Sequence, residues 1–304
     1  MDNNIITENE NEKDTNRKKV IWTCFAGRKH NLSVLLRYVL ALIERNIVDE
    51  CHLWNFTRKP EDDRWLRENF SEPIQSQQNA DESKNKIKLI NVKNKRSWSE
   101  YYRHYTKERY ENHIIIKCDD DVVYIDIDQF EKFLKNTENS PDSLLAFPSI
   151  INNAVCANFQ QEAGFLDVEK SGLGEFPFGI KQGRLWGNGC LAERLHHHFI
   201  DNIEEYRSLS KGMGARDVKK GIRISINLFA ILSKDLDIFK TIGRDDEHDL
   251  TVIKTVSTNR HNHIDLSCFV AHLAFSKQRV TGMNEKNVLE RYSRMADELG
   301  LPSL

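Results

Sequence analysis

The sequence predicts an α/β protein built on a mostly parallel sheet that is flanked by helices. Between residues 20 and 118, short apolar runs alternate with segments whose apolar residues recur every three to four positions. Strands and helices that alternate in this way form parallel sheets with both faces covered. A chain of 304 residues, 39% of them hydrophobic, is also long and apolar enough to bury a sizeable core.

The first half is predicted to contain four strands that are separated by helices and by one polar surface segment. Each predicted strand is a short apolar run, and Asn31 is a candidate N-cap for the helix that follows the first of them. Residues 57–86 are polar, with a short helix expected around 64–69, and an aromatic stripe predicts a helix over 98–105. The strands are expected at 20–26, 51–56, 87–92 and 113–118.

The second half is less regular. Strands are expected at 144–150 and 222–232, helices at 191–206 and 288–300, and a glycine-rich loop over 172–190. No internal repeat is present, so we expect one domain over 19–304 with an elaborated second half. Residues 1–18 read as a charged, disordered leader.

Composition and charge exclude several classes of protein. The net charge of −2 lacks the basic excess of a nucleic-acid binder that works by neutralising phosphates. Six scattered cysteines without a CxxC pair argue against a zinc ribbon, and those within apolar runs read as reduced, buried thiols. The N-terminus lacks the apolar core of a signal peptide, and the apolar stretch 31–48 is too polar for a membrane span. We therefore expect a cytoplasmic protein without a transmembrane segment.

The most informative local motif is IIIKCDDDVVYID. Acidic triplets occur three times, at Glu61–Asp63, Asp119–Asp121 and Asp245–Glu247, so the context of each decides its meaning. Asp119–Asp121 directly follows an apolar strand, and ligands bind at the carboxyl ends of strands in open α/β sheets. Three adjacent carboxylates repel one another unless a cation neutralises them, and oxygen ligands suit Mg²⁺ or Mn²⁺. The alternative is a solvated acidic turn, with Asp126 or Asp128 capping the next helix.

These residues resemble the Asp-x-Asp motif of GT-A-fold glycosyltransferases. Three later segments occur in the family's order: LWGNGC (185–190), RDDEHDLTVIK (244–254) and FVAHLAFSKQ (269–278). The resemblance covers the chain from about residue 19. It implies a GT-A-like, Rossmann-type fold in which residues 19–125 bind a nucleotide sugar and residues 126–304 form the acceptor side.

The resemblance also implies roles for individual residues. Asp119 and Asp121 would bind Mn²⁺ or Mg²⁺, His272 would complete the metal site, and Asp119 or Asp120 would reach the donor sugar or ribose. Alternatively, His272 is a core histidine on an apolar strand. The remaining donor contacts are expected from Thr23, Ala26, Gly27, Arg28, Arg96, Gly187, Asn188 and Gly189, although Arg28 and Arg96 read equally as solvated loop residues.

The catalytic base is expected within the second acidic cluster, Asp245, Asp246 and Glu247. Matching the trailing Asp-Leu favours Glu247, whereas matching the Asp-Asp pair favours Asp246. The cluster could instead be a helix N-terminal group, where carboxylates are favourable in any case.

The function that follows is metal-dependent transfer of a sugar from a nucleoside-diphosphate donor, UDP by family analogy, to a hydroxyl of a glycan or glycoprotein. A single base opposite the leaving group favours inversion. Two alternatives stay open: a carboxylate-metal phosphohydrolase or nuclease that uses two metal ions, and a catalytically silent module that binds sugars or nucleotides.

Overall fold

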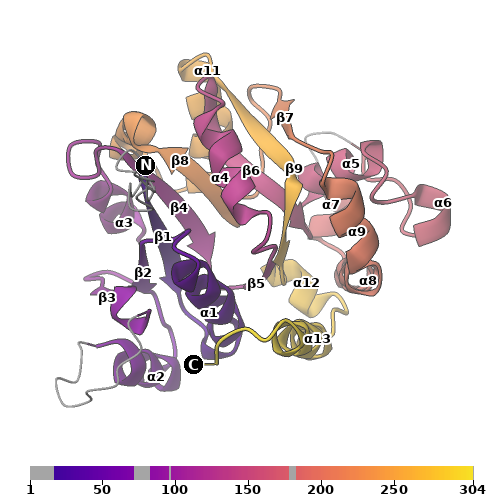
Figure 1. Ribbon diagram of the computed structural model, residues 1–304, viewed down its shortest axis with the longest axis horizontal. Coiled ribbons are helices and arrows are strands. Elements are labelled where there is room, and N and C mark those ends of the chain that lie inside the picture. Colours follow the sequence, from indigo (N-terminus) through magenta and orange to yellow (C-terminus); the bar gives the residue numbers. More distant parts are fainter. Residues whose placement is uncertain (1–16, 72–82, 96, 178–182, 304) are drawn as a thin grey trace, which may run out of the picture.

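The computed structural model describes residues 17–71, 83–95, 97–177 and 183–303, so most of the predicted leader lies outside the described residues. Within them, nine strands form one sheet in the order β3-β2-β1-β4-β8-β6-β9-β5, and β7 pairs with β9 (Figure 1). The strands are β1 (Lys19–Ala26), β2 (Glu50–Asn55), β3 (Ile87–Asn91), β4 (His113–Asp119), β5 (Val122–Ile125), β6 (Ser143–Ile151), β7 (Ala215–Val218), β8 (Leu228–Leu232) and β9 (His261–His272).

The sheet is mixed, and most of its described strands run in one direction. The pairings make β1, β2, β3, β4, β6 and β9 parallel to one another, while β5, β7 and β8 run the opposite way. The antiparallel β8 lies between β4 and β6. This arrangement confirms the predicted α/β class with a mostly parallel sheet, flanking helices and a more elaborate second half.

Helices cover both faces of the sheet. The indole of Trp22 on β1 packs on Phe130 of α4, with ring centroids 5.7 Å apart, while the hydroxyl of the next residue, Thr23, bonds to Tyr101 of α3. Because successive strand residues point to opposite faces, α4 and α3 lie on opposite sides of the sheet. Figure 1 shows α4 crossing in front of β8 and β6. The helices of the first half are α1 (Lys29–Glu44), α2 (Pro60–Phe70), α3 (Ser99–His104) and α4 (Phe130–Glu138).

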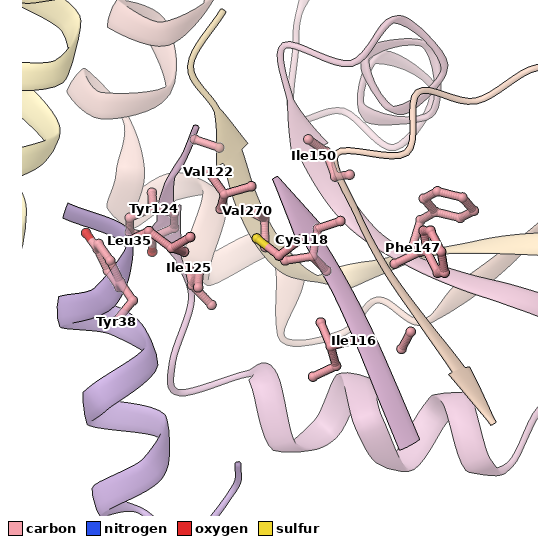
Figure 2. Close-up of a cluster of buried hydrophobic side chains, with 14 of the residues drawn as sticks. Leu35, Tyr38, Ile116, Cys118, Val122, Tyr124, Ile125, Phe147, Ile150 and Val270 are labelled. Atoms are coloured by element: carbon pink, nitrogen blue, oxygen red, sulfur yellow. The ribbon is translucent and has the colours of Figure 1, made fainter. Parts of the chain in front are cut away.

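The core is continuous between α1 and β5, the last strand in the sheet order. Figure 2 shows Tyr38 of α1 against Tyr124 of β5, and their ring centroids lie 5.6 Å apart at a near-perpendicular angle. Both side chains are fully buried. Such an edge-to-face pair contributes about 0.5–1.5 kcal/mol beyond the burial of its area. Five of the six cysteines are buried free thiols as predicted, and Cys190 is exposed.

The start of α1 corrects one prediction. The N-cap is Arg28, and Asn31 is a buried residue inside the helix. The carboxylate of Asp120, ninety-two residues away in sequence, accepts a hydrogen bond from the backbone N–H of Arg28 and so holds this end of the helix. A cap supplied by a distant strand leaves no local signal in the sequence.

The second half departs from prediction in several places. The predicted loop 172–190 contains α7 (Gly183–Trp186) and the start of α8 (Gly189–Asp201). The predicted strand 222–232 is a strand only over Leu228–Leu232, and just before it the carbonyl of Ile226 accepts from the buried ammonium of Lys117. The predicted helix 191–206 divides at Asn202, whose side chain bonds to the carbonyl of His198. The helices are α5 (Ala154–Glu162), α6 (Val168–Ser171), α7 (Gly183–Trp186), α8 (Gly189–Asp201), α9 (Ile203–Ser210), α10 (Asp246–His248), α11 (Lys254–Ser257), α12 (Ser276–Val280) and α13 (Glu285–Glu298).

None of the helices in the described ranges combines the length and the apolarity that crossing a membrane requires.

Candidate functional site

A cavity of about 590 Å³ opens at the carboxyl edge of β1, β2 and β4. This volume lies within the range of small-molecule sites. Aromatic rings of Phe25, Phe56 and Trp98 form part of its wall. Its carboxylates are Asp62, Asp119, Asp120, Asp121 and Glu247, and its permanent cations are Arg28, Arg58, Lys59, Lys95 and Arg279. The whole triplet Asp119–Asp121 and one carboxylate from each of the other two triplets, Asp62 and Glu247, therefore meet in one cavity.

Asp120 fastens the turn between β1 and α1 to the end of β4. Its Oδ2 accepts from the backbone N of Gly27 at 2.9 Å and of Arg28 at 2.6 Å, and the Arg28 Nε lies 3.1 Å from Oδ1. Burial raises the pKa of the Asp120 carboxyl, and the adjoining guanidinium offsets part of that rise. Because the Asp120 carboxylate accepts all of these hydrogen bonds, it holds Arg28 in place.

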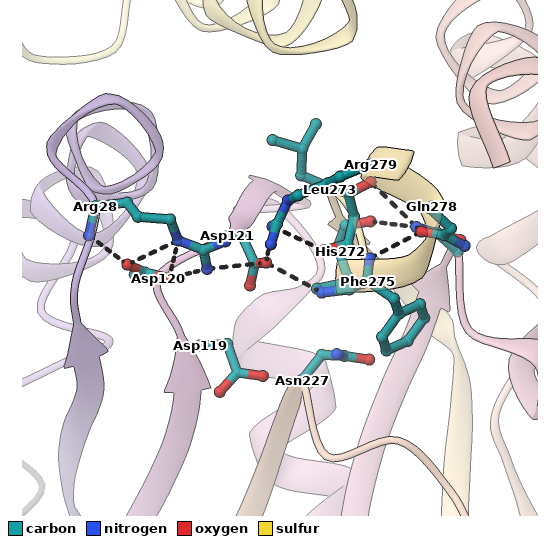
Figure 3. A network of polar contacts seen from close by, with 12 residues as sticks. Arg28, Asp119, Asp120, Asp121, Asn227, His272, Leu273, Phe275, Gln278 and Arg279 are labelled. Atoms are coloured by element: carbon teal, nitrogen blue, oxygen red, sulfur yellow. Dashed lines mark hydrogen bonds and ion pairs between the residues drawn. The ribbon is translucent and has the colours of Figure 1, made fainter. Parts of the chain in front are cut away.

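Asp121 binds three cationic or donor groups through a single oxygen. Its Oδ2 lies 3.0 Å from Arg28 Nη2, 3.1 Å from Arg279 Nη2 and 3.4 Å from His272 Nε2 (Figure 3). Burial acts to raise the pKa of this carboxyl, but the attraction of His272, Arg28 and Arg279 prevails and holds the pKa below its ordinary value. Asp121 therefore stays a carboxylate at neutral pH.

Asp119 pairs with a lysine beneath the cavity. The Nζ of Lys117, whose side chain is 2% exposed, lies 2.5 Å from Asp119 Oδ1 and 2.6 Å from the carbonyl of Ile226, over the ring of Phe25. Burial raises the pKa of Asp119 to about 6 against the opposing effect of Lys117, and the neighbouring Asp121 adds to the rise. The buried ammonium thus fixes one oxygen of Asp119.

The three carboxylates of the motif are therefore matched by three fixed cations: Lys117 at Asp119, Arg28 at Asp120 and Asp121, and Arg279 at Asp121. The repulsion from which the sequence predicted a bound cation is relieved by the chain itself.

The predicted metal site does not fit this arrangement. His272 does lie beside Asp121, and its Nδ1 is buried without a hydrogen-bond partner among the described residues. However, the Asp121 oxygen that faces His272 already lies 3.0 Å and 3.1 Å from the nitrogens of two guanidinium groups. Within the described ranges, no group of three or more His, Cys, Asp or Glu side chains is placed to hold a metal ion.

The second acidic cluster is held by one arginine. Arg223 donates through Nε to Glu247 Oε1 at 2.6 Å and through both terminal nitrogens to Asp245, at 3.0 Å each. Asp245 also caps α10 by accepting from the N–H of His248, while Asp246 accepts from the hydroxyl of Tyr102 at 2.8 Å. Of the three carboxylates only Glu247 lines the cavity.

Several other predicted contacts lie away from the cavity wall. Thr23 and Ala26 are buried in β1, and the Thr23 hydroxyl bonds to Tyr101 and to the carbonyl of Ile116. Arg96 lies outside the described residues. Only Gly27 and Arg28 of the predicted β1 contacts line the cavity.

The glycine loop before α8 has a packing role. Asn188 caps α8 by accepting from the N–H of Leu191, and Gly189 donates to the hydroxyl of Thr281. Neither these two residues nor Gly187 is among those that line the cavity. The small residue at 189 lets α8 approach α12 and the segment that follows it.

We predict that Gly189→Ala destabilises the fold by about 3 kcal/mol, at the upper end of typical overpacking costs. A Cβ at this position would lie 2.2 Å from the carbonyl oxygen of Gln278 and 2.5 Å from the amide nitrogen of Met283, and both are backbone atoms. Urea unfolding of this variant should be compared with Gly212→Ala, where a Cβ meets nothing within 4 Å. Equal stability of the two variants would contradict the close approach.

Among the site residues missed from the sequence are the three that bind the acidic clusters: Lys117, Arg223 and Arg279. A signal existed for Lys117, because a lysine inside the apolar run HIIIKC must find a buried anion if it is to stay in the sheet. Arg223 and Arg279 lie in segments without a comparable local pattern, and only the fold brings them to the carboxylates.

Comparisons with known proteins leave the family open. No family model matches the chain, and no curated protein matches it. Among solved structures, CMP-2-keto-3-deoxy-manno-octonic acid synthetase complexed with CTP aligns with a TM-score of 0.44 and 10% identity, covering 93% of this chain and 99% of that one. GalNAc-T7 with UDP, GalNAc and Mn²⁺ aligns with a TM-score of 0.46 and 10% identity, covering 87% of this chain and 45% of that one. At TM-scores below 0.5, neither similarity supports an activity.

Proposed function

We propose that the protein transfers a sugar from a nucleoside-diphosphate donor to a hydroxyl acceptor. One observation carries this proposal: a cavity of about 590 Å³ places cationic side chains and a carboxylate held in a fixed orientation within one wall. The cations suit the diphosphate of a donor, and the carboxylate suits an acceptor hydroxyl that has to lose its proton.

The donor half of the cavity offers charge and aromatic surface together. Arg28, Arg279 and Lys95 supply N–H donors of the kind that bind phosphate oxygens. Phe25 and Trp98 stack with ring centroids 6.5 Å apart and present flat apolar surface to the same space. A nucleotide requires both features, a polyanion site and a face on which a base can lie. UDP is the nucleotide that the resemblance to GT-A enzymes favours.

The acceptor half depends on Glu247. Arg223 donates to Oε1 of Glu247. Oε2 of Glu247 is therefore the oxygen that can accept a proton from a substrate in the cavity. In the proposed step the acceptor oxygen forms a bond to the anomeric carbon, the bond from that carbon to the diphosphate oxygen breaks, and Glu247 takes the acceptor proton. The nucleoside diphosphate leaves with the bonding electron pair. A base on the face opposite the leaving group gives inversion of configuration.

The phosphohydrolase or nuclease alternative is less compatible with this site. A two-metal mechanism needs carboxylate oxygens that are open to the ions. Here Asp120 and Asp121 are both bound by guanidinium groups and Asp119 by a buried ammonium. The wall therefore offers anchored cations in place of open carboxylate ligands.

Binding of nucleotides tests the proposal. A thermal-unfolding panel should compare uridine, UMP, UDP and the corresponding guanine and cytosine compounds. We expect a diphosphate to stabilise the protein most, by about 2.7 kcal/mol at a hundred times its dissociation constant. A panel in which no nucleoside diphosphate exceeds its nucleoside would contradict the proposed donor site.

A further inference from the structure

We propose that the donor diphosphate in this site is neutralised by the two arginines on Asp121, Arg28 and Arg279, so that nucleotide binding does not require a divalent cation. This inference rests on the proposed function and departs from what the resemblance implies. Asp121, which the sequence predicted as a metal ligand, is instead bound by two arginines in the structure.

Asp121 is already surrounded by positive charge. Two guanidinium nitrogens lie 3.0 and 3.1 Å from the same Asp121 oxygen that lies nearest to His272. A divalent ion on that oxygen would lie within a few ångströms of two permanent positive charges, in a buried setting where screening is weak. Binding the ion would therefore first require both arginines to leave, and Asp120 holds one of them.

Each arginine is held by acceptors on the Nε and Nη2 side of its guanidinium. Arg28 uses Nε and Nη2 on Asp120 and Asp121, while Arg279 uses Nε on Glu285 and Nη2 on Asp121 and the carbonyl of Ala274. In hydrogen bonds between described residues neither arginine uses Nη1. Both residues line the cavity, so each presents an unengaged pair of N–H donors next to it. Figure 3 shows the two side chains converging on Asp121 from β1–α1 and from α12.

A planar guanidinium held on one edge is well suited to phosphate. Its remaining N–H groups are already oriented, so little side-chain entropy is lost when a phosphate oxygen accepts from them. Two such groups on opposite sides of Asp121 match the two phosphates of a diphosphate.

The cavity also has two cations at its rim that are not paired with any carboxylate of the described ranges. The triplet and its three cations balance one another, so a polyanionic ligand needs further charge. Arg58 and Lys59 line the same cavity, are exposed, and form no ion pair with any residue of the described ranges. These two side chains supply the charge that a divalent ion would otherwise bring.

Calorimetry with UDP, and with GDP as a second probe, tests the inference directly. Affinity should be measured in EDTA and in Mn²⁺ for the wild type, for Arg279→Gln and for Lys277→Gln. Lys277 is a matched control because it lies on the same short helix, loses the same charge, and contacts Trp186 rather than the cavity.

We expect the wild-type dissociation constants in EDTA and in Mn²⁺ to agree within about threefold. Loss of the Arg279 guanidinium should weaken binding by about tenfold or more in both conditions, as expected for a charge-assisted contact to phosphate. Lys277→Gln should bind as the wild type does, and Arg279→Lys, which keeps the charge, should recover part of the affinity. Unfolding curves of each variant show whether a loss of affinity is caused by a loss of stability.

Two results would overturn the inference and leave the proposed function standing: binding that disappears in EDTA, or wild-type affinity in a folded Arg279→Gln variant. Absence of nucleoside-diphosphate binding in both EDTA and Mn²⁺ would instead overturn the proposed function itself.

Discussion

Glu247→Gln is expected to lower the rate of sugar transfer by about 10²–10⁴-fold, the usual contribution of a general base. The amide keeps the size of the side chain and can still accept from Arg223 through its oxygen, but it cannot take a proton from the acceptor. Nucleotide affinity should be unchanged, because the diphosphate is bound by cations elsewhere in the cavity. Steady-state transfer assays and calorimetry on the same preparation measure the two quantities separately.

Asp246→Asn is the matched comparison for this prediction. Asp246 belongs to the same acidic triplet but bonds to Tyr102 and does not line the cavity. We expect its effect on transfer to stay below about tenfold, since an amide oxygen still accepts from the tyrosine hydroxyl. A large loss in Asp246→Asn with near wild-type transfer in Glu247→Gln would reverse the assignment of the base.

Lys117→Met is expected to have the largest effect on stability, a loss of about 2–4 kcal/mol. Removing one partner of a buried ion pair leaves the other uncompensated, and this generally costs about 3–5 kcal/mol. The expected value is lower because the side chain of Asp119 is 29% exposed and is partly solvated. Urea unfolding at pH 8 measures the loss.

The pH dependence of that loss follows from Asp119. Its folded-state pKa of about 6 already exceeds the ordinary value, and removal of the ammonium would raise it further. The folded state then binds more protons than the unfolded state, so stability rises as the pH falls. The deficit of Lys117→Met relative to the wild type should therefore shrink between pH 8 and pH 5.

A second substitution separates this explanation from simple loss of packing. Asp119→Asn in the Lys117→Met background removes the uncompensated charge and should restore at least half of the lost stability. A double variant that is as unstable as Lys117→Met at every pH would contradict the account of the ion pair.

The parallel half of the sheet could be predicted from the sequence because its strands are continuous apolar runs. In β4, for example, the isoleucines at 114–116 are buried on both faces, and the acidic triplet marks the end of the strand. The position of that triplet at the carboxyl edge followed from the same pattern. The position of the cavity was thus within reach of sequence reasoning, whereas Glu247 was expected near it only from the resemblance to GT-A enzymes.

The partners of the carboxylates could not be predicted in the same way. Arg28 was considered for the donor, but its bond to Asp120 spans ninety-two residues, and Arg279 reaches Asp121 across 158. Pairs at such separations depend on which strands become neighbours in the sheet. Arg279 lies on α12, directly after β9, and β9 is placed in the sheet by its pairings with β5, β6 and β7. The sequence showed three carboxylates that needed cations, and the fold supplied those cations from the chain.

The central claim is that a sugar passes from a nucleoside diphosphate to a hydroxyl in this cavity, and product analysis by mass spectrometry tests it most directly. The wild type should be incubated with a panel of nucleoside-diphosphate sugars and mixed glycan acceptors, with Glu247→Gln in parallel. The account predicts equal amounts of free nucleoside diphosphate and an acceptor heavier by one sugar, both strongly reduced in the variant. Release of nucleoside monophosphate with sugar phosphate, or hydrolysis that Glu247→Gln leaves unaffected, would contradict it.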